Sequence, residues 1–357
     1  MTTRPQSRTG LTGAAAVLAA VAGMFAAPAA LANGCLPGYS QYYLCLAGDS
    51  GKGTLRNAVS TPTLHSATFL GQLSGMGGRN AFAGLAAPRY ALDGETGAAA
   101  AGGAPRWNVW FAAGENQQAY TFQPARSEGR STLALGGVDY TFAGNIVAGV
   151  AVNIDRTRSI FQANLNSPLT VNGHSIAPYV SIPFARNWLF DASVGFGESR
   201  IKVTDYNAPA EGDTKSDRTF VSLALSYAAR TGNWALAGKA NYVETSDKIA
   251  SFTMTDRTFI PASTVRVAQM RLGGQASYNA GMFVPFIGLT YIRDLQSPSQ
   301  AAFGGQTPAN DKDGWQWALG LNLFSRGALS GGVMVTSETG RTQVKNDVFL
   351  ANIAIRF

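Results

Sequence analysis

The segment that ends the chain, residues 347–357, constrains the fold more than any other stretch of this sequence. Phe349, Ile353, Ile355 and Phe357 all fall on one face of a strand, because successive side chains of a strand point to opposite sides. An apolar ladder that runs to the last residue is unusual in a soluble domain, whose termini usually fray. In lipid, a barrel strand must stay paired to its end, because an open edge leaves backbone groups without hydrogen-bond partners. The segment is therefore typical of the closing strand of a membrane barrel. The last core strand of a soluble sandwich is the alternative.

The composition is compatible with such a barrel. Charged residues make up 14% of the chain, against about 25% in an ordinary soluble domain. No run of about 18 apolar residues follows the N-terminal region, which argues against membrane-spanning helices. The formal net charge of +7 is scattered among apolar residues, without the basic block or interleaved aromatic side chains of a nucleic-acid-binding surface. We therefore expect no nucleic-acid partner.

Residues 1–32 have the three parts of a secretory signal peptide. Arg4 and Arg8 form a basic head, an apolar run follows, and Ala30–Ala32 supplies the small residues of a cleavage site. The apolar run is short and rich in Ala and Gly, which argues against an uncleaved membrane helix. The sequence therefore predicts export and cleavage after Ala32.

Residues 33–105 are predicted to form a short leader that begins with a stapled loop. Cys35 and Cys45 are the cysteines of the chain, and a disulfide between them is the natural prediction in an oxidising compartment. The alternative, metal-binding or catalytic thiols, would need further ligands or bases, and the histidines are limited to His65 and His174. We predict neither a metal site nor a cofactor.

Two features invite a catalytic interpretation. Gly48–Gly51 resembles the turn around a hydrolase nucleophile, with Ser50 in the nucleophile's position. A nucleophile also needs a base and an orienting acid around a formed pocket, and the leader is too short to provide them. His174 is the candidate base for a catalytic site at the rim of a barrel, but no partner stands out in the sequence. A Gly/Asp/Ser turn explains the first feature, and we predict that the protein is not an enzyme.

A short helix is predicted within the leader, at about residues 54–75. Thr61–Pro62 is a typical helix start, and apolar residues from Leu64 to Leu73 follow at roughly helical spacing. Gly75–Gly78 ends the segment. The Ala/Gly-rich stretch at 97–104 is typical of a flexible linker.

From residue 106 onward the sequence predicts strands. Trp188, Val194 and Phe196 share one face of a ladder, and Asp191 lies on the other. Ladders of this kind are longer than most soluble strands and match tilted membrane strands. Aromatic residues at their ends fit a membrane interface. We expect an all-β, twelve-stranded antiparallel transmembrane barrel over 106–357, with strands at about 106–113, 130–141, 144–155, 173–183, 187–201, 217–229, 232–244, 264–279, 282–294, 313–324, 328–338 and 347–357.

The predicted connections alternate between long and short. Short turns such as Arg230–Thr231 and Ala280–Gly281 are expected to alternate with long loops such as 114–129, 156–172 and 202–216. Outer-membrane barrels of bacteria show this alternation, with long loops outside and tight turns in the periplasm. Both ends of the barrel region are therefore expected on the periplasmic side.

Polar residues opposite the apolar ladders are expected to line the lumen. A twelve-stranded barrel lies between the filled eight-stranded barrels and the open porins, so one helix can pass through it. We interpret these residues as ordinary solvation of the lumen, with a specific binding site as the alternative. They are Asp191, Lys239, Asn241, Gln269, Arg271, Gln275, Gln316 and Asn322.

Short motifs within the barrel region carry a family resemblance: Gly136–Tyr140, Ala148–Val150, Ile176–Tyr179, Pro285 and Arg356–Phe357. In this order and spacing, and with twelve strands, the region resembles an autotransporter β-domain. The resemblance implies folding by the outer-membrane assembly machinery, which reads the terminal strand, a helix in the pore, and a passenger delivered outside. The residues expected to form this assembly signal are Phe349, Ile353, Ile355 and Phe357.

The leader is far shorter than the passengers usual in this family, which are several hundred residues long and often repetitive. We therefore expect an outer-membrane barrel of a Gram-negative bacterium that displays a small N-terminal segment through its own pore. A passive, porin-like channel with a periplasmic tail is the alternative. The partners implied are outer-membrane lipid, the barrel-assembly machinery and periplasmic chaperones; the sequence identifies no surface ligand.

Overall fold

The computed structural model describes residues 106–121, 126–143, 146–161, 166–185, 187–206, 209–296, 311–324 and 329–357. The predicted signal peptide, the Cys35–Cys45 disulfide, Ser50, the helix at 54–75 and the linker lie outside these residues.

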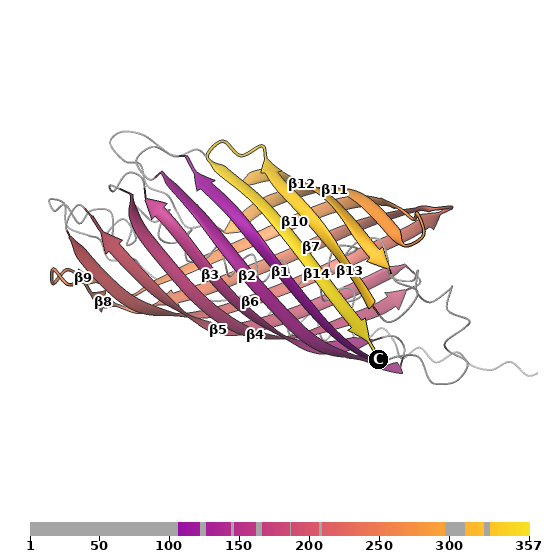
Figure 1. Ribbon diagram of the computed structural model, residues 1–357, viewed down its shortest axis with the longest axis horizontal. Coiled ribbons are helices and arrows are strands. Elements are labelled where there is room, and N and C mark those ends of the chain that lie inside the picture. Colours follow the sequence, from indigo (N-terminus) through magenta and orange to yellow (C-terminus); the bar gives the residue numbers. More distant parts are fainter. Residues whose placement is uncertain are drawn as a thin grey trace, which may run out of the picture. The chain divides into compact units, whose positions relative to one another are not determined.

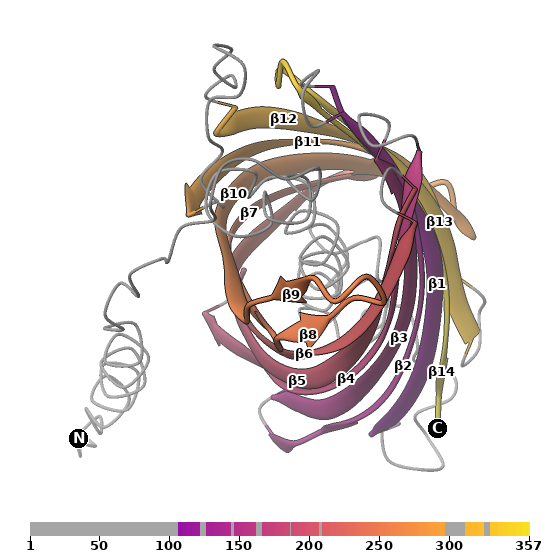
Figure 2. The same ribbon diagram turned by 90° about the vertical axis from the view of Figure 1, so that its left-hand side faces the viewer.

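The described residues form an antiparallel β-barrel of twelve strands that closes on itself (Figures 1 and 2). Each barrel strand pairs with its neighbour in sequence, and the first strand pairs with the last. The fold therefore agrees with the predicted strand number and order. The barrel strands are β1 (Trp107–Tyr120), β2 (Ser127–Thr141), β3 (Val147–Phe161), β4 (Ser167–Ala185), β5 (Trp188–Asp205), β6 (Ala210–Thr231), β7 (Trp234–Ile249), β10 (Ser263–Tyr278), β11 (Phe283–Gln296), β12 (Asp313–Phe324), β13 (Leu329–Thr339) and β14 (Val344–Arg356).

The pairing of β1 with β14 closes the barrel. Its register runs along both strands as far as the pair Tyr120 and Val344. At the other end, the backbone N–H of Trp107 donates to the carbonyl of Phe357, and the N–H of Phe357 donates back to Trp107, both at 3.1 Å. The terminal segment is thus the closing strand, paired to its last residue, as its ladder predicted.

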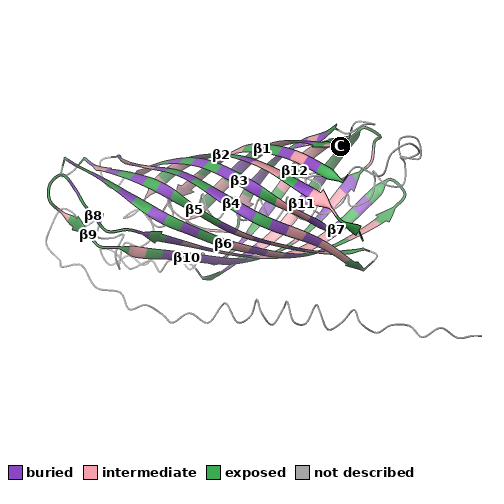
Figure 3. Ribbon diagram, turned by 90° about the horizontal axis from the view of Figure 1, so that it is seen from below, coloured by how far each residue is buried: buried purple, intermediate pink, exposed green. Residues whose placement is uncertain are grey.

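Side chains alternate between a buried inner face and an exposed outer face along the strands (Figure 3). On β5, Asp191 and Ser193 are 1% and 5% exposed, whereas Phe196 is 52% exposed. The outer faces of the other strands likewise carry large apolar residues, such as Ile154 at 63%. A continuous exposed apolar surface of this kind is suited to hydrocarbon, because monomeric soluble proteins keep such patches small.

Aromatic rings gather at the end of the barrel that holds Phe357. Trp107 packs against Tyr140 and Trp188 against Tyr227, each with ring centroids 5.0 Å apart. Amphipathic rings at strand ends are typical of a membrane interface. Two more pairs are Trp234–Tyr278 at this same end and Tyr291–Trp315 near the opposite end.

The tight turns lie at this aromatic end as well. Gly232 and Gly281 adopt φ angles of +58° and +77°, a left-handed conformation that a residue without Cβ adopts at little cost. They connect β6 to β7 and β10 to β11 with hairpins that leave almost no loop. These short connections were predicted within a residue or two.

Several strands are longer than predicted at the opposite end. β1 continues to Tyr120 and β2 begins at Ser127, so most of the loop expected at 114–129 is strand. The loops expected at 156–172 and 202–216 are wrong for the same reason. These segments alternate charged outward residues with small polar inward residues, a composition that looks like a loop although the backbone still pairs as a sheet.

The added strand length makes the barrel uneven in height. The tall wall, β4 to β6, has strands of 19, 18 and 22 residues. The low wall, β12 to β14, has strands of 12, 11 and 13 residues. A tilted strand needs about 9–11 residues to cross the hydrocarbon, so the tall wall extends well beyond it.

A small hairpin, β8 (Phe252–Thr253) with β9 (Phe259–Ile260), covers the inner face of the tall wall. It lies at the end of the barrel opposite Phe357 (Figures 1 and 2). The backbone N–H of Thr255 donates to the carbonyl of Glu211 on β6 at 2.9 Å. The hydrophobic cluster that joins hairpin and wall consists of Leu169, Val171, Ile201, Val203, Ala210, Ile249, Phe252, Met254, Ile260 and Val265.

Candidate functional site

The inner surface of the barrel is the candidate functional site, because buried polar side chains line it on every side. All eight residues predicted to line the lumen occupy inward positions; six are buried, whereas Lys239 and Arg271 are half-buried. The structure distributes them rather than gathering them into one pocket. They are Asp191 on β5, Lys239 and Asn241 on β7, Gln269, Arg271 and Gln275 on β10, and Gln316 and Asn322 on β12.

Some of these predicted residues contact partners on neighbouring strands. The hydroxyl of Ser181 donates to Asp191 at 2.7 Å, and Lys239 on β7 is close enough to act electrostatically on that carboxyl group. The guanidinium of Arg271 donates to the side-chain oxygen of Gln316 at 3.3 Å. Such pairing is needed because a buried charge without a partner is costly. Removal of one partner of a buried ion pair costs about 3–5 kcal/mol of stability.

A buried ion cluster that the sequence did not reveal lies on the inner face of β3, β6 and β7. Arg218 Nη1 lies 2.7 Å from the carboxylate of Asp155, and its Nε lies 3.3 Å from Asp247. The three side chains are 2%, 1% and 0% exposed. Gly173 on β4 lies against Arg218 and Asp155, and a Cβ there would collide with the guanidinium. The cluster ties strands together across the tall wall.

A second ion cluster lies beside the low wall. Arg341 donates to both carboxylate oxygens of Asp294 at 2.9 and 3.0 Å and also pairs with Glu338 at 2.7 Å. The amide of Gln269 donates to the same Asp294 at 2.7 Å. The fork geometry suits a planar guanidinium. The predicted Gln269 therefore belongs to a network whose charged members were missed.

A third polar group lies toward the aromatic end of the lumen. Trp110 donates its indole N–H to the hydroxyl of Tyr179 at 2.9 Å, and that hydroxyl donates to Asp139 at 2.8 Å. Asn108 also donates to Asp139 at 3.0 Å. The rings of Trp110 and Tyr179 also belong to a cluster of buried hydrophobic residues on the inner face of the barrel. This end of the lumen is therefore lined by apolar surface as well as by polar groups.

The missed residues carried one sequence signal. Asp155 and Arg218 fall at inward positions of the predicted strands 144–155 and 217–229, and Asp247 does so when the strand predicted at 232–244 is extended. Arg218 and Asp247 are directly opposite each other on the adjacent strands β6 and β7, so the register of that hairpin alone brings them together. Asp155 lies on β3, which does not neighbour β6, and a local pattern does not show which distant strands approach each other inside the barrel. The ladders therefore mark the three positions but not the cluster.

The arrangement supplies hydrogen bonding and paired charge. Within the described ranges, no group of three or more metal-ligating side chains is close enough to hold an ion. His174 is exposed on the outer face of β4, across from Glu198 on β5, and so does not face the lumen. Of the described residues, none belongs to a helix long and apolar enough to span a membrane.

The predicted assembly-signal residues all lie on the outer face of the closing strand. Phe349, Ile353, Ile355 and Phe357 are 50%, 45%, 46% and 66% exposed. Their side chains therefore form one ladder that a lipid or a protein can contact along β14. The structure shows their placement and leaves their role as a prediction.

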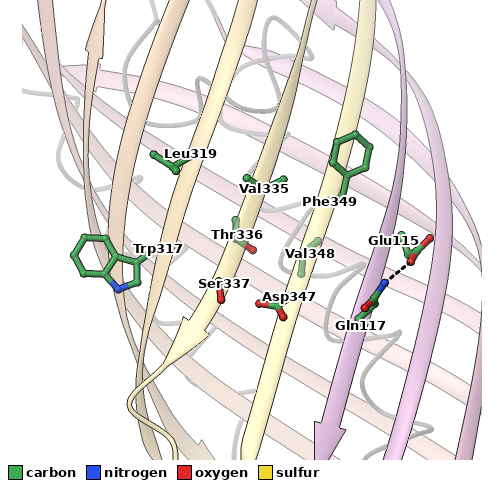
Figure 4. A pocket seen from close by; sticks show the side chains of 10 residues that line it. All are labelled: Glu115, Gln117, Trp317, Leu319, Val335, Thr336, Ser337, Asp347, Val348 and Phe349. Carbon is green, nitrogen blue, oxygen red and sulfur yellow. Dashed lines mark hydrogen bonds between the residues drawn. The ribbon is translucent and has the colours of Figure 1, made fainter.

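A groove on the outer face crosses the low wall (Figure 4). Its volume is about 370 Å³, with Trp317 and Leu319 on one side and Phe349 on the other. Glu115 and Asp347 form its polar end, where the apolar outer surface stops. The groove is thus part of the outer surface rather than of the lumen. Gln117, Val335, Thr336, Ser337 and Val348 complete its lining.

Comparison with known proteins gives this geometry a family. The sequence model described as "Autotransporter beta-domain" matches residues 89–333. No curated protein sequence matches the chain. The structure is similar to the translocator domain of the autotransporter NalP from Neisseria meningitidis, with a TM-score of 0.61 and 13% identity, over 71% of this chain and 89% of that chain.

Two further solved structures share the fold. The β domain of the Bordetella autotransporter BrkA matches with a TM-score of 0.59 and 12% identity, over 71% of this chain and 100% of that chain. The transport unit of the autotransporter AIDA-I from Escherichia coli matches with a TM-score of 0.59 and 13% identity, over 70% of this chain and 90% of that chain.

Proposed function

Because this chain belongs to the autotransporter β-domain family, we propose that its barrel passes its own N-terminal leader, residues 33–105, through the lumen and displays it at the cell surface. The observation that carries the proposal is a closed barrel with an exposed apolar outer face and a polar lumen whose charges are paired. The first property suits insertion into lipid, and the second suits contact with a polypeptide backbone.

The membrane proposed is the outer membrane of a Gram-negative bacterium. The signal sequence predicted at 1–32 supports export. The belt of aromatic side chains at the end that holds Trp107 and Phe357 supports a membrane interface there. With the tight turns at this end, both termini of the barrel would lie on the periplasmic side. The tall wall would then rise into the medium. Folding would involve the barrel-assembly machinery and periplasmic chaperones, with the ladder of β14 as the signal.

The lumen would act on the leader without chemistry. Buried amides and hydroxyls on its wall can exchange hydrogen bonds with a passing backbone, and cations already bound to Asp155 or Asp294 attract acidic segments less strongly than free ones. The helix predicted at 54–75 would remain in the lumen once the segment before it has crossed. We propose a transport and display role rather than an enzymatic one.

An accessibility experiment in intact cells tests the proposal. An epitope tag beside Cys35 should bind antibody and be removed by external protease. A tag inserted at Gly232 serves as the periplasmic control and should stay protected, whereas a tag within 297–312 should be reached. Recognition of the Cys35 tag only after permeabilisation of the outer membrane would contradict display.

The polar lumen on its own supports a second candidate, a passive channel. Planar-bilayer recordings of the full-length barrel and of a variant lacking residues 33–105 separate the two. A leader that occupies the lumen should keep conductance low until it is deleted. Equal, high conductance of both proteins, with a protected Cys35 tag, would favour the channel.

A further inference from the structure

Cationic side chains lie on the outer face of the tall wall and its neighbour β3, beyond the apolar surface. Arg156 and Arg158 continue the outward ladder of β3 past Ile154, which is 63% exposed. Arg200 continues the outward ladder of β5, and Asn172 that of β4. All four of these polar side chains are exposed. We name Arg156, Arg158, Asn172 and Arg200 the cationic patch.

The strand register brings the patch together. Asn172 on β4 is directly opposite Arg156 on one side and Arg200 on the other. Neighbouring strands are about 4.8 Å apart, so the two arginine backbones lie about 10 Å from each other with the asparagine between them. Arginine side chains are long enough to meet over that distance. An anion above Asn172 is therefore within reach of guanidinium groups from both sides.

The height of the patch matches one layer of a bilayer. On β5, Trp188 belongs to the belt of aromatic side chains at the end that is proposed to face the periplasm. From Trp188 to Arg200 the strand climbs about 30 Å, at about 3.3 Å per residue and about 40° of tilt. The apolar band of an outer-membrane barrel is about 25 Å tall. Arg200 thus lies just outside the far edge of the hydrocarbon, at the level of lipid headgroups.

The cations of the patch lack carboxylate partners. The cross-strand neighbours of Arg156 are Thr132 and Asn172, and neither is acidic. Among the residues that the structure describes, no ion pair involves Arg156, Arg158 or Arg200. Unpaired arginines side by side repel each other, and an external anion removes that repulsion.

Nearby acids are directed elsewhere or lie beside the patch. Glu211 pairs with Lys202 at 3.0 Å, and Glu115 pairs with Arg130. Glu198 and Asp217 face each other one step closer to the apolar surface. Three outward carboxylates lie one step away in register: Glu128 on β2 is diagonal to Arg158, and Asp213 and Asp217 on β6 are diagonal to Arg200. Glu128 pairs with Arg126, and cations are directly opposite two of the patch arginines, Arg130 opposite Arg158 and Lys215 opposite Arg200.

We propose that the cationic patch binds the phosphorylated headgroup of an outer-leaflet lipopolysaccharide. Guanidinium groups of Arg156, Arg158 and Arg200 would bind phosphate oxygens through paired N–H donors, and the amide of Asn172 would add another donor. The acyl chains would lie against exposed apolar residues below, such as Ile154 and Phe196. The contact would fix the tall wall at the outer leaflet. This inference rests on the proposed outer-membrane location.

Capture of the purified full-length protein on immobilised lipopolysaccharide tests the contact, with chelator present so that divalent cations do not bridge carboxylates to phosphate. The test variant is R156Q/R158Q. The matched control is R293Q/K345Q, which removes two outward cations from β11 and β14. We expect the apparent affinity for lipopolysaccharide to fall about tenfold or more in the test variant. The variant lacks two arginines, and each basic residue near an anionic headgroup strengthens binding severalfold. The control should bind like the parent protein.

Three outcomes would overturn the proposal: equal binding of lipopolysaccharide from which phosphatase has removed the phosphates, equal loss in both double variants, and unchanged binding by R156Q/R158Q. A heat-modifiable band in gel electrophoresis checks that each variant is folded. Because capture uses purified barrel, its outcome is independent of the Cys35 tag experiment, and failure of leader display would not be mistaken for failure of lipid binding.

Discussion

The tall wall and the low wall solve different problems with the same strand pattern. In the low wall, strands of 12, 11 and 13 residues are close to the length that hydrocarbon alone requires. In the tall wall, strands of 18 to 22 residues continue into water. There the lipid no longer covers any face, and the sheet must find other apolar contacts.

The hairpin β8–β9 provides these contacts. Phe252, Met254 and Ile260 are 8%, 4% and 5% exposed, and they pack on inward residues such as Val171 and Ile201. The extension therefore has a small core of its own, below which the Arg218 cluster joins β3, β6 and β7. The comparison shows that the thickness of the lipid sets the minimum length of a strand, and that side-chain packing stabilises any length beyond it.

The largest effect is expected from a change in the low wall that opens the barrel closure. Deletion of Phe357 removes the reciprocal backbone hydrogen bonds with Trp107 and leaves the end of β1 unpaired at the membrane interface. We expect folded barrel in the outer membrane to fall about tenfold or more, because closure loses its last backbone pair and the proposed assembly signal on β14 loses its last side chain. Heat-modifiable band intensity measures this.

The tall wall offers the matched control for that deletion. Replacement of residues 251–261 by a short Gly/Ser linker removes the hairpin but keeps every barrel strand. Folded barrel should remain near the level of the parent protein. Normal assembly without Phe357, or failed assembly without the hairpin, would contradict the division of roles between the walls.

The next effect concerns the ion cluster of the tall wall. R218L leaves Asp155 and Asp247 buried without their cation, and we expect a loss of about 3–5 kcal/mol in the free energy of unfolding. Urea titration of the barrel in detergent, followed by tryptophan fluorescence, measures the loss. R218L/D155N/D247N should recover most of it. A triple variant as unstable as R218L would show that the cost is steric rather than electrostatic.

A smaller, local effect is expected from F252A. The ring contacts the wall in the apolar cluster at the top of the barrel, so its removal should loosen the hairpin while the barrel stays intact. Hydrogen exchange at the amides of Met254 and Thr255 should accelerate about tenfold or more. The control is F349A on the low wall, whose side chain faces outward and which should leave these amides unchanged. Faster unfolding of the whole barrel, or unchanged exchange, would contradict this prediction.

The smallest effect is expected at the exposed pair of Lys202 and Glu211. A hydrogen bond to Glu211 raises the pKa of Lys202, so any stability it contributes is present below the ordinary pKa of lysine and is lost as the pH rises through the folded-state value. Because both side chains are about half exposed, we expect K202Q to unfold like the parent protein at neutral pH, and the two to remain alike at alkaline pH. A clear destabilisation at neutral pH that disappears in alkali would show that the pair matters.

Much of the fold could be predicted from local pattern. The ladder of β5 from Trp188 to Phe196 places apolar residues outward and Asp191 inward, and this follows from strand geometry alone. The tight turn between β6 and β7 was equally visible, although it lies at Gly232 and not at Arg230–Thr231 as predicted. The ends of β1, β3 and β5 were not visible, because the apolar signal stops where lipid stops while the backbone goes on pairing. The cluster at Arg218 was missed for another reason: Asp155 and Arg218 lie within predicted strands, but on strands that do not neighbour each other.

By itself the sequence determined the outward and inward faces of the strands, because these depend on neighbours one or two residues apart. The short turns between consecutive ladders indicated the strand order, and the apolar ladder that ends at Phe357 indicated the closing strand. Only the tertiary structure decided which distant residues meet. Closure and strand stagger bring Asp155 beside Arg218, fold Phe252 onto the tall wall and place Arg156 near Arg200. Such contacts depend on the register of whole strands, and no local pattern encodes that register.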